Sequence, residues 1–187
     1  SLRALCLLRD YGMRVGIRFT VHRRNLDQLP AIFDLLEQEA VDRFCVYHLA
    51  YAGRGERIQS LDLSPAQTRA AMEYIFDRAE DFHERGLDKE VLTVDNAVDS
   101  IILLDRVGER QPGRVQEVTR MLLWNGGNQS GLAISSIDPV GDVHVDQFSW
   151  NYSLGNVRSR PFSTIWSDAS HPRLAALRQN PRPIKGR

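Results

Sequence analysis

An amphipathic helix flanked by two apolar strands lies close to the start of the sequence. In the segment 13–21 every second residue is apolar, which places one set of side chains on a single face of a strand. This set consists of Val15, Ile17, Phe19 and Val21. The segment 26–40 has an apolar stripe at helical spacing, and the segment 42–52 is almost continuously apolar, as a buried parallel strand would be. The pattern predicts a right-handed βαβ unit and therefore an α/β fold.

Later segments predict further helices, a third strand and a hairpin. Ser64 and Pro65 open a helix, as an N-cap residue and a proline in the first turn do. Residues 90–96 predict a short strand, and two helices broken at Pro112 follow. After a cluster of Gly, Asn and Ser at 126–131, two extended runs joined by a turn predict a hairpin, so we expect a boundary at this cluster.

The composition limits the class of protein. The 187 residues suffice for one sizeable domain or for a domain with an appendage. Lys and Arg total 24, as do Asp and Glu, so the net charge gives no reason to expect nucleic acid or a membrane surface as a partner. No apolar run approaches the roughly 20 residues that span a bilayer, and the charged start 1–16 leads us to expect no signal peptide. Cys6 and Cys45 should be small buried hydrophobes without a disulfide framework, which favours a cytoplasmic location.

His144 and Asp146 follow the turn of the predicted hairpin, in the stretch IDPVGDVHVDQF. A strand has a two-residue side-chain period, so both side chains should share a face. They could be metal ligands, a catalytic pair or polar residues on the wet face of the hairpin. No second pair of ligands stands at a recognisable spacing, so the residues resemble neither a zinc site nor a triad.

Polar side chains follow both predicted parallel strands. The carboxyl ends of parallel strands border ligand sites in open sheets and in barrels, so these residues should lie beside a pocket. They are Thr20, His22 and Arg23 after the first strand and Tyr47 and His48 after the second. The two histidines could be acid–base groups or ligands, or they could be hydrogen-bonded within the fold. Arg18 lies opposite Ile17 and needs a carboxylate or a ligand as partner if its strand is buried on both sides.

The loop 52–57, AGRGER, leaves the second strand directly. It could present backbone N–H groups around Gly53 and the side chain of Arg54 to an anionic group. The alternative is a glycine-rich exit loop with a solvated arginine. Asn25 should cap the helix that follows it, and the three tryptophans should pack the C-terminal unit. The tryptophans are Trp124, Trp150 and Trp166.

Two long stretches resemble parts of the radical S-adenosylmethionine (SAM, AdoMet) enzymes. The last two β/α units of the family's partial (β/α)6 barrel are similar to MRVGIRFTVHRRNLDQLPAIFDLLEQEAVDRFCVYHLAYAGRG. The opening of a SPASM-type extension is similar to SSIDPVGDVHVDQFSWNYSLGNVRSRPFSTIW, most specifically over residues 153–166. Within the superfamily, the group that acts in d1-haem biosynthesis is most similar to the motifs FTVHRRN, YHLAYAGRG, WNGGNQSG and RPIKGR.

The resemblance implies an enzyme with two kinds of iron–sulfur centre. A 4Fe-4S cluster would cleave SAM reductively, and the resulting 5′-deoxyadenosyl radical would attack the propionate side chains of a sirohaem-derived tetrapyrrole. An auxiliary Fe–S cluster would lie in the SPASM-like module. The partners would be the tetrapyrrole substrate and a reductant protein such as ferredoxin or flavodoxin, with neither nucleic acid nor a membrane involved.

The resemblance also implies roles for segments and residues. Residues 1–62 would be the C-terminal part of the barrel, 63–128 a helical connector and 129–187 the start of the SPASM-like module. Cofactor-binding residues would be Arg18 and Thr20 beside SAM, Tyr47, His48 and Leu49 beside its adenine, and Gly53 and Arg54 in the exit loop. Asp146 stands where relatives place a cluster cysteine and would be a metal ligand, with an exposed hairpin residue as the alternative.

The chain departs from the family pattern in ways that bear on activity. The CxxxCxxC loop that binds the SAM cluster would precede residue 1, and the C-terminal cysteines would follow Arg187. We therefore expect the chain to represent the C-terminal half of an enzyme and to be inactive by itself. Two alternatives remain: a SPASM enzyme that modifies a peptide, and a cluster-free binding or scaffold module.

Overall fold

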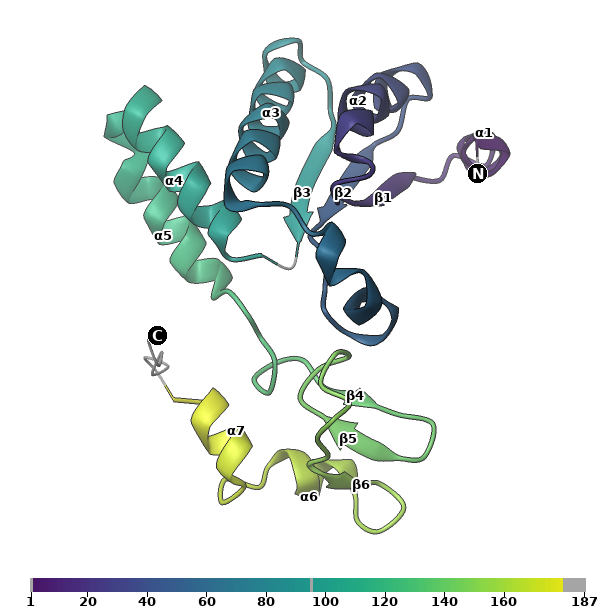
Figure 1. Cartoon of the computed structure of the whole chain (residues 1–187), viewed down its shortest axis with the longest axis vertical. Coiled ribbons are helices and arrows are strands. Elements are labelled where there is room, and N and C mark those ends of the chain that lie inside the picture. The colour runs from purple at the N-terminus through teal and green to yellow at the C-terminus, as the bar shows by residue number, and fades with distance from the viewer. Residues whose placement is uncertain (1, 95, 180–187) are drawn as a thin grey trace. The chain divides into compact units, whose positions relative to one another are not determined.

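The computed structural model describes residues 2–94 and 96–179. The chain divides into two compact units, Ser1–Trp124 and Asn125–Arg187. The first contains a three-stranded parallel sheet with its helices, and the second contains a small antiparallel sheet (Figure 1). Each unit has its own cluster of buried apolar side chains, as a domain does.

The first unit alternates helices and strands. Its elements are α1 (Leu2–Asp10), β1 (Gly16–Thr20), η1 (Leu26–Gln28), α2 (Leu29–Gln38), β2 (Arg43–Tyr47), η2 (Gly53–Leu61), α3 (Pro65–Glu84), β3 (Glu90–Val94), α4 (Val98–Arg110), η3 (Pro112–Arg114) and α5 (Val115–Asn125), where η marks a 3-10 helix. The strands are parallel and pair in the order β1-β2-β3. Since α2 connects β1 to β2 and α3 connects β2 to β3, the sheet consists of two consecutive βαβ units, and the predicted α/β class is confirmed.

The hydrophobic core of the first unit lies on one face of the parallel sheet. Ile17 of β1 pairs with Phe44 of β2, which pairs with Val91 of β3. On this face Phe33 of α2 meets Phe44 edge-on, with ring centroids 5.2 Å apart, and lies 5.8 Å from the ring of Phe82 of α3. The apolar side chains of β1 therefore share one face of the sheet, as predicted, and α2 and α3 cover this face (Figure 1).

α3 begins where the sequence predicts. The hydroxyl of Ser64 accepts a hydrogen bond from the amide of Gln67, and the Gln67 side chain accepts one from the amide of Ser64, at 3.3 and 3.0 Å. This reciprocal capping box satisfies two amides that the first helical turn would otherwise leave unpaired. Pro65 occupies the first helical position, where it has no amide hydrogen to lose.

A buried arginine fastens α4 to α3. Arg106 of α4 is 3% exposed and forms ion pairs with Glu73, Asp77 and Glu80 of α3, at 2.8, 2.6 and 2.6 Å. Burial alone would lower the pKa of Arg106, but hydrogen bonds to Glu80, Asp77 and Glu73 raise it above its ordinary value. The guanidinium thus stays charged and holds the two helices together through several charge-assisted hydrogen bonds.

The second unit is built around three short antiparallel strands. Its elements are β4 (Ser136–Ile137), β5 (Asp142–His144), β6 (Gly155–Asn156), α6 (Phe162–Trp166) and α7 (Pro172–Leu177). The strand order is β4-β5-β6, which confirms the predicted hairpin and adds a strand that the sequence did not suggest. Apolar side chains from all parts of the unit form its core, namely Val143, Val145, Leu154, Ile165 and Leu174.

The tryptophan prediction is correct for only one of the three side chains. Trp166 packs against the core of the second unit. Trp124 lies on α5, a helix of the first unit without a buried residue, and is 90% exposed. Trp150 is 58% exposed, although its ring stacks on His144. Both cysteines are free, with Cys45 buried and Cys6 half-buried.

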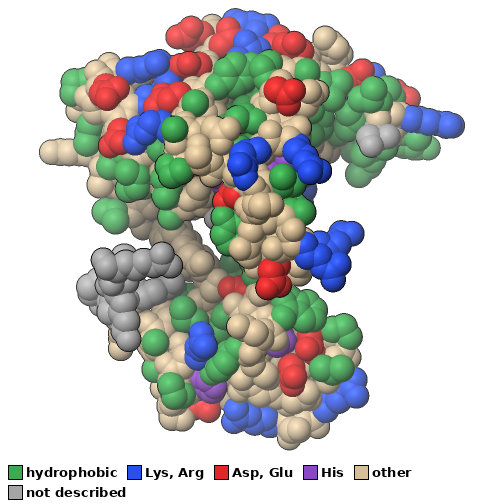
Figure 2. Space-filling view, viewed as in Figure 1, with side chains coloured by type: hydrophobic (Ala, Val, Ile, Leu, Met, Phe, Trp, Pro, Cys, Tyr) green, Lys and Arg blue, Asp and Glu red, His purple; other side chains and the backbone are tan. Residues whose placement is uncertain are grey.

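Charged side chains of both signs are interspersed on the visible face of each unit (Figure 2). This mixture agrees with the equal totals of 24 basic and 24 acidic residues. Among residues 2–94 and 96–179, none of the helices combines the length and the apolar character that a membrane crossing requires.

Candidate functional site

The exits of the three parallel strands lie side by side at the carboxyl edge of the sheet. The amide of Val21, just beyond β1, donates to the carbonyl of Tyr47 at 2.9 Å. The amide of His48, just beyond β2, donates to the carbonyl of Val94 at 3.4 Å. These bonds continue the ladder past the strand ends, so the predicted site segments are brought together where parallel sheets bind ligands.

The sheet face opposite α2 and α3 carries several of the predicted cofactor-binding residues. Arg18 and Thr20 of β1 are exposed there, and the guanidinium carbon of Arg18 lies 5.6 Å from the ring centroid of Tyr47. Leu92 of β3 shares this face and is 37% exposed. β1 has core contacts on only one face, so the burial on both sides that would oblige Arg18 to have a partner does not occur. The face offers a cation, a hydroxyl and an aromatic ring to a ligand.

Asn25 shapes the exit of β1 instead of capping a helix. Its side-chain oxygen accepts from the amide of His22 at 2.8 Å, and its side-chain nitrogen donates to the carbonyl of Thr20 at 3.0 Å. No side-chain capping bond forms at η1, so the predicted cap is wrong. His22 Nδ1 accepts from the amide of Arg24 at 3.2 Å, which matches the alternative of a histidine hydrogen-bonded within the fold.

His48 is held by a carboxylate from α4. Its Nε2 atom lies 2.8 Å from Oδ2 of Asp99, and the two side chains are 12% and 4% exposed. The other carboxylate oxygen of Asp99 is buried and has no hydrogen-bond partner among the described residues. Sequence spacing does not reveal this pair, because Asp99 follows His48 by 51 residues and stands in the first turn of a helix, where acidic residues are common.

The loop after β2 has a fixed backbone. A Cβ atom at Gly55 would lie 2.0 Å from the carbonyl oxygen of Ala50, so only glycine fits there. Gly53 has a φ angle of 56°, and Leu49 is half-buried at the start of the loop. Arg54 is exposed and forms no hydrogen bond or ion pair with a described residue. The loop thus presents a cation without a described partner, on a turn that requires glycine at residue 55, and this suits an anionic ligand.

A shallow pocket of about 310 Å³ lies between the first turns of α3 and α4. Its walls combine apolar and polar side chains, including Leu63, Thr68, Arg69, Asn96, Val98 and Ile102. None of the residues that the sequence proposes for a site lines this pocket. The carboxyl edge of the sheet therefore remains the candidate site of the first unit.

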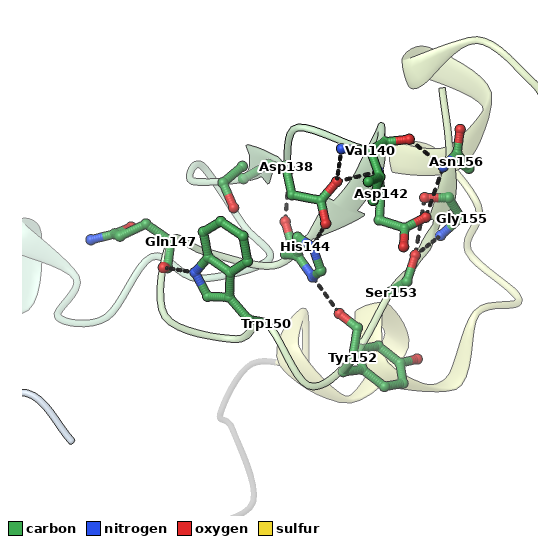
Figure 3. Close-up of polar contacts among 12 residues, drawn as sticks. Asp138, Val140, Asp142, His144, Gln147, Trp150, Tyr152, Ser153, Gly155 and Asn156 are labelled. Atoms are coloured by element: carbon green, nitrogen blue, oxygen red, sulfur yellow. Dashed lines mark hydrogen bonds and ion pairs between the residues drawn. The ribbon is translucent and has the colours of Figure 1, made fainter. Parts of the chain in front are cut away.

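His144 is enclosed in the second unit with both ring nitrogens occupied (Figure 3). It is 2% exposed; Nδ1 lies 2.6 Å from the carbonyl oxygen of Tyr152, and Nε2 lies 3.3 Å from Oδ2 of Asp138. The ring of Trp150 stacks on it at 5.8 Å. Burial alone would lower the pKa of His144, but the bonds to Tyr152 and Asp138 raise it above its ordinary value. Neither nitrogen directs a lone pair at a ligand.

Asp146 has different neighbours from His144. Its Oδ1 atom accepts from the amides of Phe148 and Ser149, both at 2.8 Å. Burial alone would raise the pKa of Asp146, but hydrogen bonds from Ser130, Phe148 and Ser149 lower it. Within residues 2–94 and 96–179, no group of three or more His, Cys, Asp or Glu side chains is placed to hold a metal ion. The acidic partner of His144 is thus Asp138, before the turn, and any cluster at Asp146 needs ligands from elsewhere.

Known proteins related to the chain match nearly all of it. Fe-coproporphyrin III synthase of Methanosarcina barkeri is 45% identical over 184 residues, which make up 98% of this chain and 46% of that protein. Pre-heme d1 synthase of Dinoroseobacter shibae is 40% identical over 178 residues, 94% of this chain and 44% of that protein. The chain therefore spans about half the length of the curated relatives it matches. No protein-family profile matches the chain.

Solved structures support the fold. SuiB of Streptococcus suis has a TM-score of 0.62 at 14% identity, with 95% of this chain and 39% of SuiB covered. SuiB bound to the precursor peptide SuiA also has a TM-score of 0.62, at 13% identity and over 91% and 37% of the two chains. Identity this low bears on the fold alone. The chain is homologous to half of Fe-coproporphyrin III synthase and of pre-heme d1 synthase, which confirms the resemblance to the radical SAM family found in its sequence.

Proposed function

We propose that the chain forms part of a radical SAM enzyme that modifies a haem-type tetrapyrrole. The observation that carries this proposal is the identity of 45% and 40% to two proteins named for tetrapyrrole products. Each match covers at least 94% of the chain, so it includes both units. Since the chain spans 46% and 44% of these relatives, the activity is assigned to a longer protein that contains it.

In this proposal the two units have separate roles. Residues 1–62 form the last β/α units of a partial barrel, 63–128 the helical connector, and 129–187 the opening of a SPASM-like module. The parallel order β1-β2-β3 supports the barrel assignment, since a (β/α) barrel is made of consecutive parallel βαβ units. The hairpin β4-β5 supports the assignment of the module.

SAM binding is assigned to the carboxyl edge and the open face of the parallel sheet. Tyr47 and Leu49 offer aromatic and apolar contacts for an adenine, and the cations of Arg18 and Arg54 suit a carboxylate. Thr20 and Gly53 are the remaining residues assigned to SAM. These residues suit SAM because they offer polar groups, and because neither Arg18 nor Arg54 forms an ion pair with a described acid. Bound SAM would supply a radical after reductive cleavage at an iron–sulfur cluster. The described residues cannot hold that cluster, so its ligands are assigned to the rest of the protein.

The finer proposal concerns the substrate. The radical would attack propionate side chains of a sirohaem-derived tetrapyrrole on the way to d1 haem, which fits the relative named for pre-heme d1. A ferredoxin or flavodoxin would deliver electrons in the cytoplasm. This chain contributes binding and orientation of SAM, while the chemistry requires the complete protein.

A product assay tests the proposed function. The full-length protein that contains this chain, purified without oxygen, should convert SAM to 5′-deoxyadenosine in the presence of dithionite. A sirohaem-derived tetrapyrrole should increase that yield and change in mass, as measured by mass spectrometry. The 187-residue chain alone should form no 5′-deoxyadenosine. A full-length protein that contains iron yet cleaves no SAM would contradict the proposal.

Ligation of an auxiliary cluster by Asp146 is a further part of the proposal. Asp146→Asn keeps an oxygen that can accept from the amides of Phe148 and Ser149 but is a poorer metal ligand. Asp146→Cys restores the thiolate that clusters prefer. We expect the Asn variant of the full-length protein to lose the iron of about one cluster and the Cys variant to retain it. Equal iron content in the wild type and both variants would show that Asp146 is not a cluster ligand and only stabilises its turn.

A peptide-modifying enzyme is the second candidate function. It is favoured by one observation, the fold shared with SuiB bound to a precursor peptide. Identity of 13% to SuiB against 45% to a tetrapyrrole synthase makes the tetrapyrrole the better substrate class. Peptides that stimulate SAM cleavage, with tetrapyrroles inert, would reverse this order. A full-length protein without iron and without SAM cleavage would instead favour a cluster-free scaffold.

A further inference from the structure

Asp99 is a buried acid with a single side-chain partner. It is 3% exposed, and Oδ2 lies 2.8 Å from Nε2 of His48, while Oδ1 is buried with no hydrogen-bond partner among the described residues. A carboxylate removed from water needs several hydrogen bonds to offset its desolvation. The hydrogen bond to His48 is therefore the one side-chain contact through which Asp99 can affect the candidate site, among the described residues.

The carboxylate decides which nitrogen of His48 carries the hydrogen. An ionised carboxylate only accepts, so beside it Nε2 is the N–H donor, and in the neutral tautomer that donates from Nε2 the lone pair is on Nδ1. No described residue forms a hydrogen bond with Nδ1. His48 is the residue just beyond the carboxyl end of β2, so its unused acceptor lies at the edge of the sheet to which SAM binding is assigned.

The position of Asp99 is fixed by the rest of its helix. Its amide donates to the carbonyl of Asn96 at 3.3 Å, which sets the first turn of α4. Two turns further on, Arg106 binds Glu73 of α3 at 2.8 Å and anchors the helix. The carboxylate is thus delivered to His48 by a helix that cannot easily shift, as a residue that orients another one should be.

We propose that Asp99 is a positioning residue that fixes the ring and the tautomer of His48, so that Nδ1 accepts a hydrogen bond from a nucleoside. The inference rests on the proposed function, since the nucleoside is that of SAM, whose adenine amino group and ribose hydroxyls are donors. An ionised tetrapyrrole carboxylate has no hydrogen to donate and does not match a neutral acceptor. His48 therefore selects the cofactor, and Asp99 acts only through His48.

A double-mutant cycle tests this dependence. The SAM dissociation constant is measured by equilibrium dialysis on the full-length, anaerobically purified protein and its variants. Loss of one hydrogen bond in His48→Gln should weaken binding by roughly 3- to 10-fold. Asp99→Asn should weaken it similarly, because an amide can donate to Nε2 and move the hydrogen to Nδ1. The double variant should lose no more than His48→Gln alone. Asp105→Asn, an exposed acid on the same helix, should bind SAM normally.

Nitrogen-15 NMR of histidine-labelled, cluster-free full-length protein reports the tautomer of His48 directly. The wild type should show an unprotonated Nδ1 at His48, and Asp99→Asn should show a protonated one. A protonated Nδ1 in the wild type, additive effects in the cycle, or normal SAM binding by Asp99→Asn would each overturn the inference. If Asp99→Asn fails to fold, as judged by its melting curve, the wild-type spectrum and His48→Gln still decide. SAM cleavage by the wild type tests the proposed function separately.

Discussion

The Nε2 atom of His144 lies 3.3 Å from Oδ2 of Asp138, across the turn that joins β4 to β5. The opposite ring nitrogen lies 2.6 Å from the carbonyl oxygen of Tyr152, in the segment that leads to β6. One buried imidazole therefore connects the turn of the hairpin to the third strand of the small sheet. The residue that the sequence offered as a ligand is a structural link of the second unit.

Replacement of His144 with Phe should destabilise the second unit. The ring volume is kept, but the Tyr152 carbonyl and the Asp138 carboxylate lose their buried donor, at a cost of about 1–3 kcal/mol in the free energy of unfolding. Urea denaturation followed by tryptophan fluorescence measures the change. His83→Phe, at an exposed position of α3, should remain within about 0.5 kcal/mol of the wild type. Equal stability of the two variants would show that His144 is not a link.

Replacement of Arg106 with Met should loosen α4 from α3. The buried cation disappears and leaves Glu73 without a described partner and Asp77 and Glu80 with only the exposed Arg110. The loss should cost about 1–3 kcal/mol, because the carboxylates are partly solvated. Arg69→Met removes the exposed pair with Asp105 and should cost at most about 1 kcal/mol. The denaturant midpoints of the two variants give the two losses of stability, provided that the m-value, the dependence of the unfolding free energy on denaturant, is unchanged. A loss no larger in Arg106→Met than in Arg69→Met would contradict the role of the buried cation.

The same network predicts a loss of stability in acid. The hydrogen bond from Arg106 is the main reason that the pKa of Asp77 lies below its ordinary value of 3.8, with the charges of Arg106 and Arg110 adding to it against burial. A carboxylate with a lowered pKa in the folded protein stabilises the fold above the unfolded value and loses that contribution as the pH falls through the folded value. The free energy of unfolding should therefore decrease below about pH 4. The decrease should be shallower in Arg106→Met, and an unchanged slope would count against this assignment.

Gly55→Ala should distort the loop after β2. The new Cβ would stand 2.0 Å from the carbonyl oxygen of Ala50, so the backbone between β2 and η2 must move. We expect lower stability and weaker SAM binding by the full-length protein, seen in melting curves and equilibrium dialysis. Gly108→Ala is the matched control, because its Cβ meets nothing within 4 Å inside α4 and should stabilise the helix by about 0.5–1 kcal/mol. Normal SAM binding by Gly55→Ala would show that this loop is not part of the SAM site.

The parallel sheet could be predicted because the spacing of apolar residues in each strand shows which of its faces are buried. Alternation in β1 and a continuous apolar run in β2 are the patterns of an edge strand and a central strand, and β2 does lie between the other two. The same alternation does not tell whether anything covers the second face, so the exposure of Arg18 could not be deduced. Burial of that side chain depends on elements elsewhere in the fold.

The spacing of residues in the sequence does not show which polar side chains are partners in the candidate sites. His48 meets Asp99 only because α4 folds back across 51 residues. In the hairpin, strand periodicity pairs His144 with Asp146, yet the turn brings Asp138 to the ring instead. Turn geometry and helix packing decide such pairs, and neither leaves a local signature in the chain.

The three parallel strands divide two tasks between alternate residues. Ile17 and Phe44 point into the core and secure folding, whereas Arg18, Thr20 and Tyr47 point the other way. Substitutions in the second set leave the packing of the first largely intact. Ligand preference can therefore diverge among relatives through alternate positions of one small sheet, while the scaffold beneath it stays constant.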